Sequence, residues 1–398
     1  MTNEPAGVRA QRSVRHIALV EFPSSGGLFQ FSLQLGEALA RAGDDVEVIT
    51  GPAPELASRE PGCRVRSILP TWHPMAGSGA PGWWRPFRRL IRAARHTAAW
   101  LTLLAYLFRT RPHIVMWSDW RFPIDEWGVR LVRKTLPNAV LVLVAHEPRP
   151  LVQQPGQAWM YKASRVTHRA LAGAYADLDV AFVLGESAKT VLAEAWPITT
   201  PIYVIPHGDE SIFASTEIPG ADTTQPVVLA FGTITKYKGI DTLWLAWPMV
   251  RARVPNAELF IVGAVLADQD ESVLRARAAT LPGVHLHVGY VPVERVPQYF
   301  ARARCVVLSY KRSSQSGVAH LAHTLRRPVV ATSVGDIPSV VSHEVSGLLV
   351  DPDNPAALAH ALVSLLTDPV AARAMGDAGA RALASWDTVA ARLRQGLP

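Results

Sequence analysis

The residues best suited to bind an anion lie between positions 305 and 338. An apolar strand is predicted at 306–308 and a helix at 318–325, with a polar loop between them. The first amides of a helix lack partners and carry partial positive charge, so a phosphate can accept their hydrogen bonds. Ser316 is expected to cap this helix, and Gly317 to let a ligand approach the backbone. The simpler alternative is an ordinary loop whose serine only caps the helix. The polar loop contains Lys311, Arg312, Gln315, Ser316 and Gly317.

A second segment of the same kind runs from 226 to 239. It reads as a strand, a turn at Gly232, two lysines, Lys236 and Lys238, and the start of a helix near Ile240. Lysines at a helix start can form charge-assisted hydrogen bonds with a phosphate. This segment is therefore a second candidate for binding a charged leaving group.

The first half of the chain has its own glycine loop. A strand at 16–21 leads into a loop at 22–30, which contains Gly26 and Gly27, and then into a helix at 31–42. A strand at 46–50 completes a βαβ unit, which indicates a parallel sheet. Further strands are predicted at 114–117, 140–145, 180–185 and 202–206.

His146 directly follows the predicted strand at 140–145. Parallel α/β sheets bind ligands at the carboxyl ends of their strands, so His146 is a candidate for contact with a substrate. The alternative is a loop histidine without a special role.

These segments resemble the GT-B glycosyltransferases of the retaining family-4 type. The likeness spans about residues 226–366 and rests on FGTITKYKGIDTLWLA, PNAELFIVG, HVGYVPVERVPQYFARA, SYKRSSQSGVAHLA, RPVVATSVGDIPSVV and SGLLVDPDNPAALAHAL. The glycine loop near Gly26 is similar to the loop that opens the first domain of that family. The resemblance implies an α/β protein with two Rossmann-like parallel-sheet domains facing a cleft, and a C-terminal helix that crosses back to the first domain.

The implied domain boundaries follow from the same likeness. They are a disordered tail at 1–14, an acceptor-binding domain at 15–210, a linker at 211–225, a nucleotide-sugar-binding domain at 226–370, and C-terminal helices at 371–398 that pack on the first domain. Trp386 is expected to anchor those helices. The polar residues 1–14 do not have the pattern of a signal peptide.

The resemblance also assigns roles to individual residues. His146 is expected to contact the donor sugar, and Lys238 to stabilise the diphosphate as charge develops on it. Closure of the two domains is expected to exclude water. The donor site is expected to consist of Gly26, Gly27, Gly232, Lys236, Lys238, Gln315, Ser316 and Gly317. The nucleotide sugar is a substrate, and no cofactor and no metal are expected. Two Asp-x-Asp sequences, at 177–179 and 351–353, resemble the metal-binding motif of another glycosyltransferase fold. We do not expect either of them to bind a metal.

The sequence departs from the family pattern at several positions. Many relatives carry two glutamates in the central unit, where this chain has Ser313 and Leu321. A subgroup with a Gln-Ser-Gly loop also lacks them, and 315–317 is similar to that subgroup. Thr235 stands where that subgroup has an arginine, and Ser339 where a glutamate is common; His207 stands where the interdomain segment normally has Asn. A non-catalytic partner protein that binds a nucleotide sugar is therefore an alternative of another class.

Charge is unevenly distributed along the 398 residues. The net charge is +7, and the segment 61–118 contains nine arginines but no Asp or Glu. A helix at 83–108 would carry a basic side and an apolar side, which suits an anionic membrane surface. Its basic residues are Arg85, Arg88, Arg89, Arg92 and Arg95. The alternative is a core helix with an arginine-rich solvent face, and a nucleic-acid partner is disfavoured because no recognised binding module accompanies the charge.

The remaining composition points to the cytoplasm. The two cysteines, Cys63 and Cys305, are far apart in the sequence and are expected to be reduced. No apolar run reaches the roughly 20 residues that span a bilayer. We therefore expect a cytoplasmic enzyme, peripheral on the inner face of the membrane, whose acceptor is a glycan or a lipid-linked sugar. A soluble small-molecule acceptor is the alternative.

Overall fold

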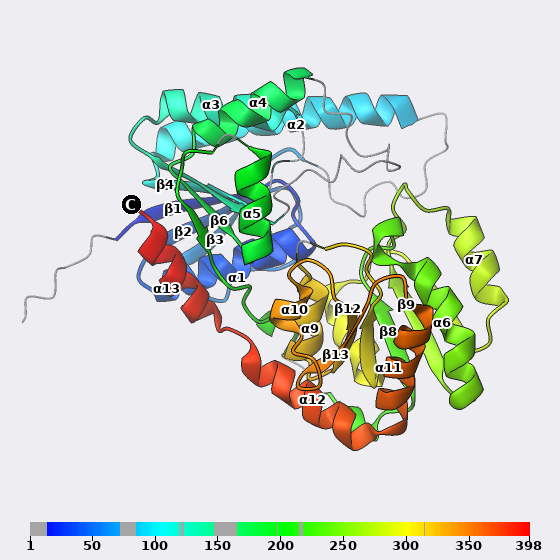
Figure 1. The fold of residues 1–398 in the computed structure, drawn as a ribbon. Coiled ribbons are helices and arrows are strands. Elements are labelled where there is room, and N and C mark those ends of the chain that lie inside the picture. The colour runs from blue at the N-terminus through cyan, green and yellow to red at the C-terminus, as the bar shows by residue number, and fades with distance from the viewer. Residues whose placement is uncertain are drawn as a thin grey trace, which may run out of the picture.

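The computed structural model describes residues 14–71, 85–118, 120, 123–146, 165–196, 198–214, 218–313 and 315–398. It contains two domains, each built around one parallel sheet with helices on both faces (Figure 1). The tail at 1–13 lies outside the described residues, as do Trp83, Trp84, Asp119 and Glu147. The predicted α/β class with two Rossmann-like domains is confirmed.

The first domain has a seven-stranded sheet in the order β3-β2-β1-β4-β5-β6-β7. Neighbouring strands run parallel, with Ile17 of β1 opposite Val46 of β2 and Ile114 of β4. The strands are β1 (His16–Glu21), β2 (Asp45–Thr50), β3 (Cys63–Ser67), β4 (Ile114–Trp117), β5 (Val140–Ala145), β6 (Val180–Val183) and β7 (Ile202–Val204). β6 and β7 each end two residues earlier than the sequence indicated.

Helices cover both faces of this sheet because successive strand residues point to opposite sides. Ile17 and Leu19 pack toward α1 and α13, whereas Ala18 and Val20 pack toward α2 and α3. The helices are α1 (Gly27–Arg41), α2 (Arg85–Thr110), α3 (Pro123–Thr135), α4 (Arg165–Ala176), α5 (Glu186–Ala195) and the C-terminal α13 (Trp386–Gly396). α1 begins at Gly27, four residues before its predicted start at Phe31, so Gly26 and Gly27 form a helix start and not the middle of a loop.

The second domain has a six-stranded sheet in the order β10-β9-β8-β11-β12-β13. Its strands are β8 (Val227–Phe231), β9 (Glu258–Gly263), β10 (Val284–Val288), β11 (Cys305–Leu308), β12 (Val329–Thr332) and β13 (Gly347–Val350). Its helices are α6 (Ile240–Arg253), α7 (Glu271–Ala279), α8 (Val296–Arg302), α9 (Gly317–Thr324), α10 (Ile337–Val340), α11 (Pro355–Thr367) and α12 (Pro369–Ala382). Short 3-10 turns are η2 (Ser211–Phe213), η3 (Ala221–Thr223), η4 (Lys236–Lys238) and η5 (Val293–Arg295).

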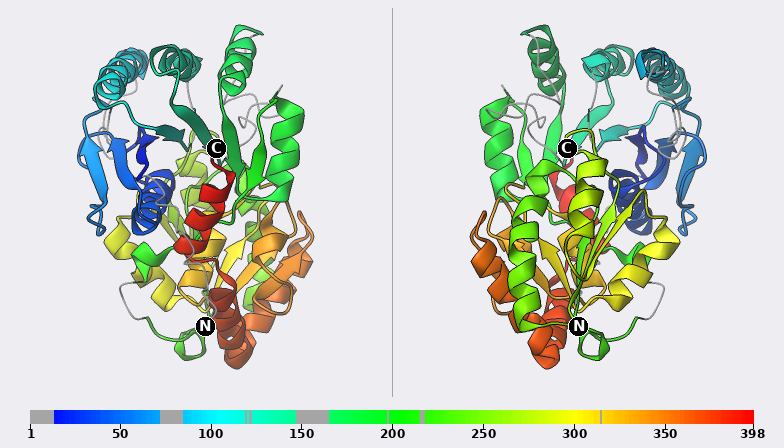
Figure 2. Two further views of the ribbon diagram at one scale, coloured as in Figure 1. Left: turned by 90° about the vertical axis from the view of Figure 1, so that its left-hand side faces the viewer. Right: turned by 90° about the vertical axis from the view of Figure 1, so that its right-hand side faces the viewer.

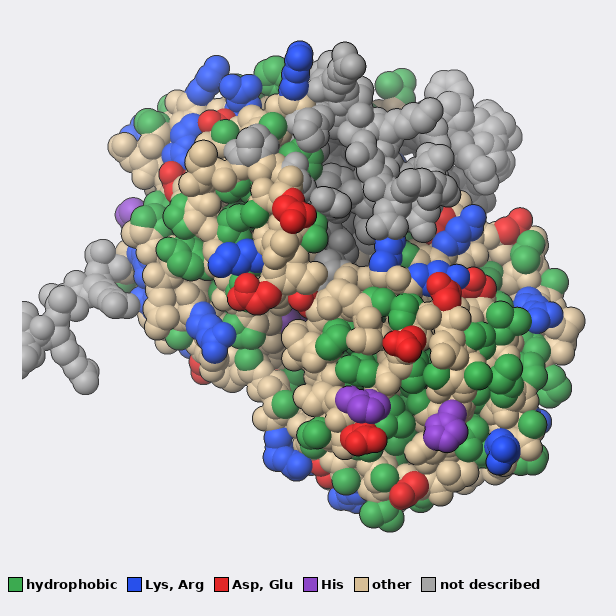
Figure 3. Space-filling view, viewed as in Figure 1, with side chains coloured by type: hydrophobic (Ala, Val, Ile, Leu, Met, Phe, Trp, Pro, Cys, Tyr) green, Lys and Arg blue, Asp and Glu red, His purple; other side chains and the backbone are tan. Residues whose placement is uncertain are grey.

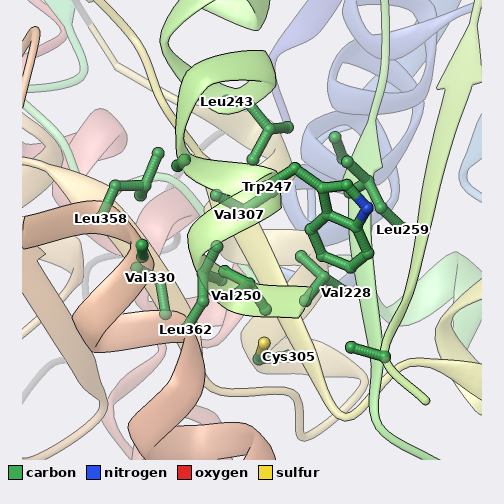
Figure 4. Packing of buried hydrophobic residues seen from close by; sticks show 14 of the residues in the cluster. Val228, Leu243, Trp247, Val250, Leu259, Cys305, Val307, Val330, Leu358 and Leu362 are labelled. Atoms are coloured by element: carbon green, nitrogen blue, oxygen red, sulfur yellow. The ribbon is translucent and has the colours of Figure 1, made fainter. Parts of the chain in front are cut away.

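Trp247 of α6 lies in the core of the second domain. It is fully buried among Val228, Leu259 and their neighbours, and its indole N–H donates to the Pro282 carbonyl at 2.9 Å (Figure 4). Burial of such a large side chain contributes strongly to a core, and its one polar atom is satisfied. This core fixes β8 and α6, the two elements that flank the turn at η4.

The chain crosses back to the first domain only at its last helix. α13 packs on α1, and the Trp386 indole donates to the Asp209 carbonyl at 2.6 Å (Figure 2). α12, in contrast, packs on α9, α11 and η3 of the second domain. The expectation that all of 371–398 packs on the first domain is therefore wrong for α12, because its apolar side is already covered within the second domain.

Candidate functional site

The start of α1 presents open backbone at the carboxyl edge of the first sheet. Gly26 has a φ of 84°, and a side chain at either Gly26 or Gly27 would meet nothing within 4 Å. The Gly26 amide is nevertheless engaged, because it donates to Glu55 Oε2 at 3.1 Å. A ligand that uses this amide must therefore displace the Glu55 carboxylate.

Glu55 also joins the two domains. Gln30 of α1 donates to its Oε2 at 3.1 Å, and the Tyr290 hydroxyl, from the second domain, donates to its Oε1. Burial and this carboxylate raise the pKa of Tyr290 above its ordinary value. The glycine loop is thus tied directly to the opposite side of the interdomain space.

Lys238 lies over the predicted glycine turn of the second domain. Gly232 has a φ of 97°, and a methyl group there would lie 3.0 Å from Lys238 Nζ and 3.4 Å from Val318 in the first turn of α9. The ammonium is 5.5 Å from the centre of the Tyr310 ring. Burial lowers the pKa of Lys238 because it disfavours the charged ammonium. An anion bound beside this ammonium would stabilise its charged form.

The other predicted cations are placed differently. The Lys236 side chain is exposed, and its backbone amide donates to Asp268 Oδ2 at 2.8 Å. Lys311 forms ion pairs with Asp241 at 2.6 Å and with Asp353 at 2.9 Å. Lys311 therefore adds no free positive charge to the polar loop, because two carboxylates compensate it.

The start of α9 has the predicted cap. Ser316 accepts a hydrogen bond from the Ala319 amide at 3.3 Å, as expected for an N-cap. Gly317 is the first residue of the helix, and Gln315 precedes the cap with its side-chain oxygen buried and without a hydrogen-bond partner in the described structure. Because a phosphate accepts hydrogen bonds, it would use the free amides of this turn.

A chain of aromatic contacts joins His146 to α9. The His146 ring meets Phe31 of α1 edge-on at 4.4 Å, and Phe31 meets His207 at 5.2 Å. His207 stacks on His320 of α9 at 4.3 Å. The predicted sugar-binding histidine and the predicted phosphate-binding helix therefore belong to one continuous layer, to which both domains contribute.

Burial keeps His207 and His320, two members of this layer, uncharged. Burial lowers the pKa of His207 to about 4 and lowers the pKa of His320 well below its ordinary value. His207 Nδ1 bonds to the Gly208 carbonyl at 2.8 Å, and His320 Nδ1 to the Ser316 carbonyl at 3.0 Å. Both imidazoles are neutral at pH 7, so they act here through packing and hydrogen bonding and not through charge.

Glu210 is a site residue that the sequence analysis did not single out. It is buried, and burial, with a smaller contribution from Asp209, raises its pKa to about 8. Gln34 of α1 donates to its Oε2 at 3.1 Å. A methyl group at Gly317 would lie 3.9 Å from Glu210 Oε1, so this carboxyl faces the start of α9. The signal available in the sequence was the acid next to the histidine-glycine pair at 207–208.

A second interdomain contact closes the site on the side of α5. Asp336 of the second domain accepts hydrogen bonds from the amides of Ser187 and Ala188 at 3.1 and 3.2 Å. The carboxylate thus caps a helix of the opposite domain, which is a favourable position for negative charge.

The two Asp-x-Asp sequences make structural contacts. Asp177 pairs with Arg130 at 3.4 Å, Asp179 with Arg133 at 2.5 Å, and Asp353 with Lys311. Among the residues that the structure describes, no group of three or more His, Cys, Asp or Glu side chains is arranged to hold a metal ion.

Most predicted donor-site residues thus converge on the space between the sheets. Lys238, Gly232 and the start of α9 form one side, and the start of α1 and His146 form the other. The Lys236 side chain, on the same turn as Lys238, is exposed. The arrangement can hold an anion at α9 and Lys238 and a neutral, hydroxyl-rich group near His146. Two Rossmann-like domains on either side of such a site are typical of the GT-B architecture.

Comparison with known proteins identifies the family. Residues 25–208 match the model of "Glycosyltransferase Family 4", and residues 225–368 match that of "Glycosyl transferases group 1". The chain belongs to the GT4-like glycosyltransferases.

Two relatives show how the likeness is distributed along the chain. The chain is 26% identical over 361 residues to a D-inositol 3-phosphate glycosyltransferase of Xylanimonas cellulosilytica, covering 83% of this chain and 81% of that protein. It is 33% identical over 182 residues to a GDP-mannose-dependent alpha-(1-6)-phosphatidylinositol monomannoside mannosyltransferase of Mycobacterium tuberculosis, covering 42% and 46%.

Solved structures show the same fold. The sucrose-phosphate synthase of Thermosynechococcus elongatus superposes with a TM-score of 0.70 at 24% identity, covering 96% of this chain and 98% of that chain. HepE of Anabaena, in complex with UDP-glucose, superposes with a TM-score of 0.66 at 15% identity, with the same coverage.

Proposed function

We propose that this glycosyltransferase moves a hexosyl group, with retention, from a nucleoside diphosphate sugar to a hydroxyl group of an acceptor. The observation that carries the proposal is the convergence of Lys238, the start of α9 and His146 across the two domains. The first two suit a diphosphate leaving group, and a neutral polar site suits a sugar. The nucleotide sugar is a substrate, and we propose no cofactor and no metal. Resemblance to the retaining family-4 type supports retention.

Donor turnover tests the proposal. We expect stabilisation of the protein by one of UDP, GDP, ADP or TDP in a thermal-shift screen, and release of that nucleoside diphosphate from the matching sugar donor. Slow hydrolysis without an acceptor separates an enzyme from a nucleotide-sugar-binding partner protein, because a binder is stabilised but releases no product. Stabilisation without hydrolysis over many hours would favour the partner protein.

We propose a membrane-associated acceptor, and the outer helices of the first domain support it. α2, α3 and α4 pack side by side, and in Figure 3 Lys and Arg side chains line the upper edge over α3 and α4. The described side chains of these three helices expose no acid, since Asp125 and Glu126 are both buried. Exposed cations on the three helices are Arg92, Arg95, Arg109, Arg130, Lys134 and Arg169. Complementarity to anionic lipid follows from this charge distribution.

Apolar side chains accompany the positive charge. Leu90 is 70% exposed, Leu101 63%, and Trp127 of α3 58%. Exposed tryptophan and leucine beside arginine are typical of helices that lie in a membrane interface. The side chains of Arg85, Arg88 and Arg89 lie outside the described structure. The alternative, that the arginines of 61–118 pair with acids within the fold, holds for Arg64 and Arg66, which pair with Asp45 and Glu47.

No single helix of the described residues is both long and apolar enough to cross a bilayer. α11 and α12, bent by 101° relative to each other, pass the same test only as a pair. We propose that the contact with the membrane is peripheral and on its inner face, and that the rest of the enzyme lies in the cytoplasm.

Co-sedimentation with liposomes tests the membrane proposal. We expect binding to vesicles that contain anionic lipid, weaker binding as salt rises, and a sharp loss when Arg88, Arg89 and Arg92 are all changed to Glu. Each arginine near an anionic surface contributes about 1 kcal/mol, and salt screens that attraction.

The matched control removes the same charge from other surfaces. Arg253, Arg277 and Arg392 are exposed on α6, α7 and α13, and changing these three to Glu should leave binding largely intact. If wild-type protein stays in the supernatant with anionic vesicles at low salt, a soluble acceptor is the better proposal. The relative that acts on D-inositol 3-phosphate supports that alternative, whereas the phosphatidylinositol mannoside transferase supports a lipid acceptor.

A further inference from the structure

The first turn of α3 holds a carboxyl group that the donor site does not use. Glu126 is 1% exposed, and within the described structure both of its carboxyl oxygens are buried without a hydrogen-bond partner. Burial, together with the adjacent Asp125, raises the pKa of Glu126 to about 8. A buried polar group without a partner is costly, so its presence requires an explanation.

The neighbouring acid, by contrast, is fully engaged. Asp125 bonds to His96 Nε2 at 2.5 Å and accepts from the Trp100 indole at 2.8 Å, and His96 packs on Phe22 at 4.6 Å. These contacts fix the first turn of α3. Glu126 is thus held by a rigid neighbour while its own oxygens are free to accept hydrogen bonds.

The position of this turn places Glu126 in the acceptor half of the site. α3 follows β4, so its first turn lies at the carboxyl edge of the sheet, where β1 ends at Glu21 and β5 leads to His146. Parallel α/β sheets bind their ligands at this edge. In this protein the edge faces the second domain, as the Glu55–Tyr290 contact shows.

Two tryptophans that precede α3 in the chain pack in the same apolar cluster as Val129 and Val132 of α3. Trp117 ends β4, Trp120 follows it, and their rings lie 6.4 Å apart. The Nε1 atoms of both are buried and, in the described part of the chain, make no hydrogen bond. Trp120 meets Tyr175 of α4 at 5.1 Å, which adds a third aromatic ring.

The unpartnered atoms restrict the chemistry of a ligand. An indole N–H only donates, whereas a carboxyl group with a pKa of about 8 is protonated at pH 7, so it donates through its O–H and accepts through its other oxygen. A phosphate dianion offers acceptors only and leaves the accepting oxygen of the Glu126 carboxyl without a donor, whereas an ammonium offers donors only and leaves the indole N–H groups without an acceptor. A hydroxyl group both donates and accepts, and aromatic rings suit the apolar faces of a sugar or cyclitol ring.

We propose that Glu126, with Trp117 and Trp120, forms an acceptor subsite that binds ring hydroxyl groups of a sugar or cyclitol. This inference rests on the proposed transferase function, because that function supplies an acceptor. In this arrangement, any phosphate of the acceptor lies away from α3. Glu126 contributes to binding of the acceptor and does not affect binding of the donor.

Binding of myo-inositol tests the subsite without turnover. We expect saturation-transfer NMR to detect myo-inositol on the wild-type enzyme in the presence of a nucleoside diphosphate. Glu126→Leu should weaken that binding at least about tenfold, whereas Glu126→Gln, which still accepts a hydrogen bond, should stay within about threefold. Glu126→Leu should also raise Tm, since it removes a buried carboxyl without a partner. Glu194→Leu, an exposed acid on α5, is the matched control and should change neither quantity.

Each other outcome overturns the assignment. Absence of myo-inositol binding to wild type, or equal binding to Glu126→Leu, contradicts a hydroxyl subsite at Glu126. Displacement of myo-inositol by ethylammonium would indicate a cation site, and displacement by inorganic phosphate an anion site. If myo-inositol binds as expected but no donor is consumed, the transferase proposal fails and the subsite stands.

Discussion

Lys238→Ala is expected to weaken binding of a nucleoside diphosphate by about 1.5–3 kcal/mol, or roughly 10- to 150-fold. Lys238 lies over Gly232 and beside the first turn of α9, so its ammonium and the helix amides can share one anion. Burial lowers the pKa of Lys238, and a bound diphosphate favours the charged form again. Affinity should therefore fall as pH rises, beginning at a lower pH than an ordinary lysine would give. Isothermal titration calorimetry measures both effects.

Lys236→Ala is the matched control for this prediction. Its side chain is exposed on the same turn, and its backbone amide donates to Asp268. We expect a markedly smaller loss than at Lys238. Wild-type affinity in Lys238→Ala, with an unchanged Tm, would show that the phosphate site lies elsewhere.

Most of the fold could be predicted because the patterns that indicate strands and helices involve residues close together in the sequence. The alternation of apolar strands with amphipathic helices predicted the parallel sheets, and β1, β4 and β5 have the predicted bounds. The errors are also local. Gly26 and Gly27 indicated a loop, but Gly26 caps α1 and Gly27 is its first residue, since glycine serves both at loops and at helix starts.

The parts of the site that could not be predicted are contacts between distant residues. Glu55 and Tyr290 are 235 residues apart in the sequence, and nothing local indicates that a carboxylate occupies the Gly26 amide. Lys311 has the same charge in the sequence as Lys238, yet two carboxylates compensate it. Which cation is available to a ligand depends on partners that only the fold brings together.

Buried acids were missed for a related reason. Glu126 and Glu210 are ordinary acidic residues in the sequence, where most acids are exposed. Burial raises the pKa of each to about 8, and burial depends on tertiary packing. Of the two, only Glu210 had a local signal, because it lies within the interdomain segment, at 205–213, that resembles the family pattern.

His146→Ala is expected to abolish most sugar transfer while leaving nucleoside diphosphate affinity nearly unchanged. His146 follows β5 at the carboxyl edge of the first sheet, across from the proposed phosphate site on α9, so its expected partner is the sugar. Loss of a hydrogen bond that strengthens in the transition state lowers kcat and leaves binding of the leaving group alone. Steady-state kinetics with calorimetry of the diphosphate separates the two quantities.

The contact between His146 and Phe31 calls for a second variant. The two rings meet edge-on at 4.4 Å, so His146→Ala also removes packing in a buried layer. His146→Phe restores an aromatic ring but cannot form hydrogen bonds. We expect His146→Phe to recover the Tm lost in His146→Ala while its turnover stays as low. Recovery of turnover in His146→Phe, or turnover within about twofold of wild type in His146→Ala, would assign His146 to packing, because removing a catalytic hydrogen bond costs far more than that.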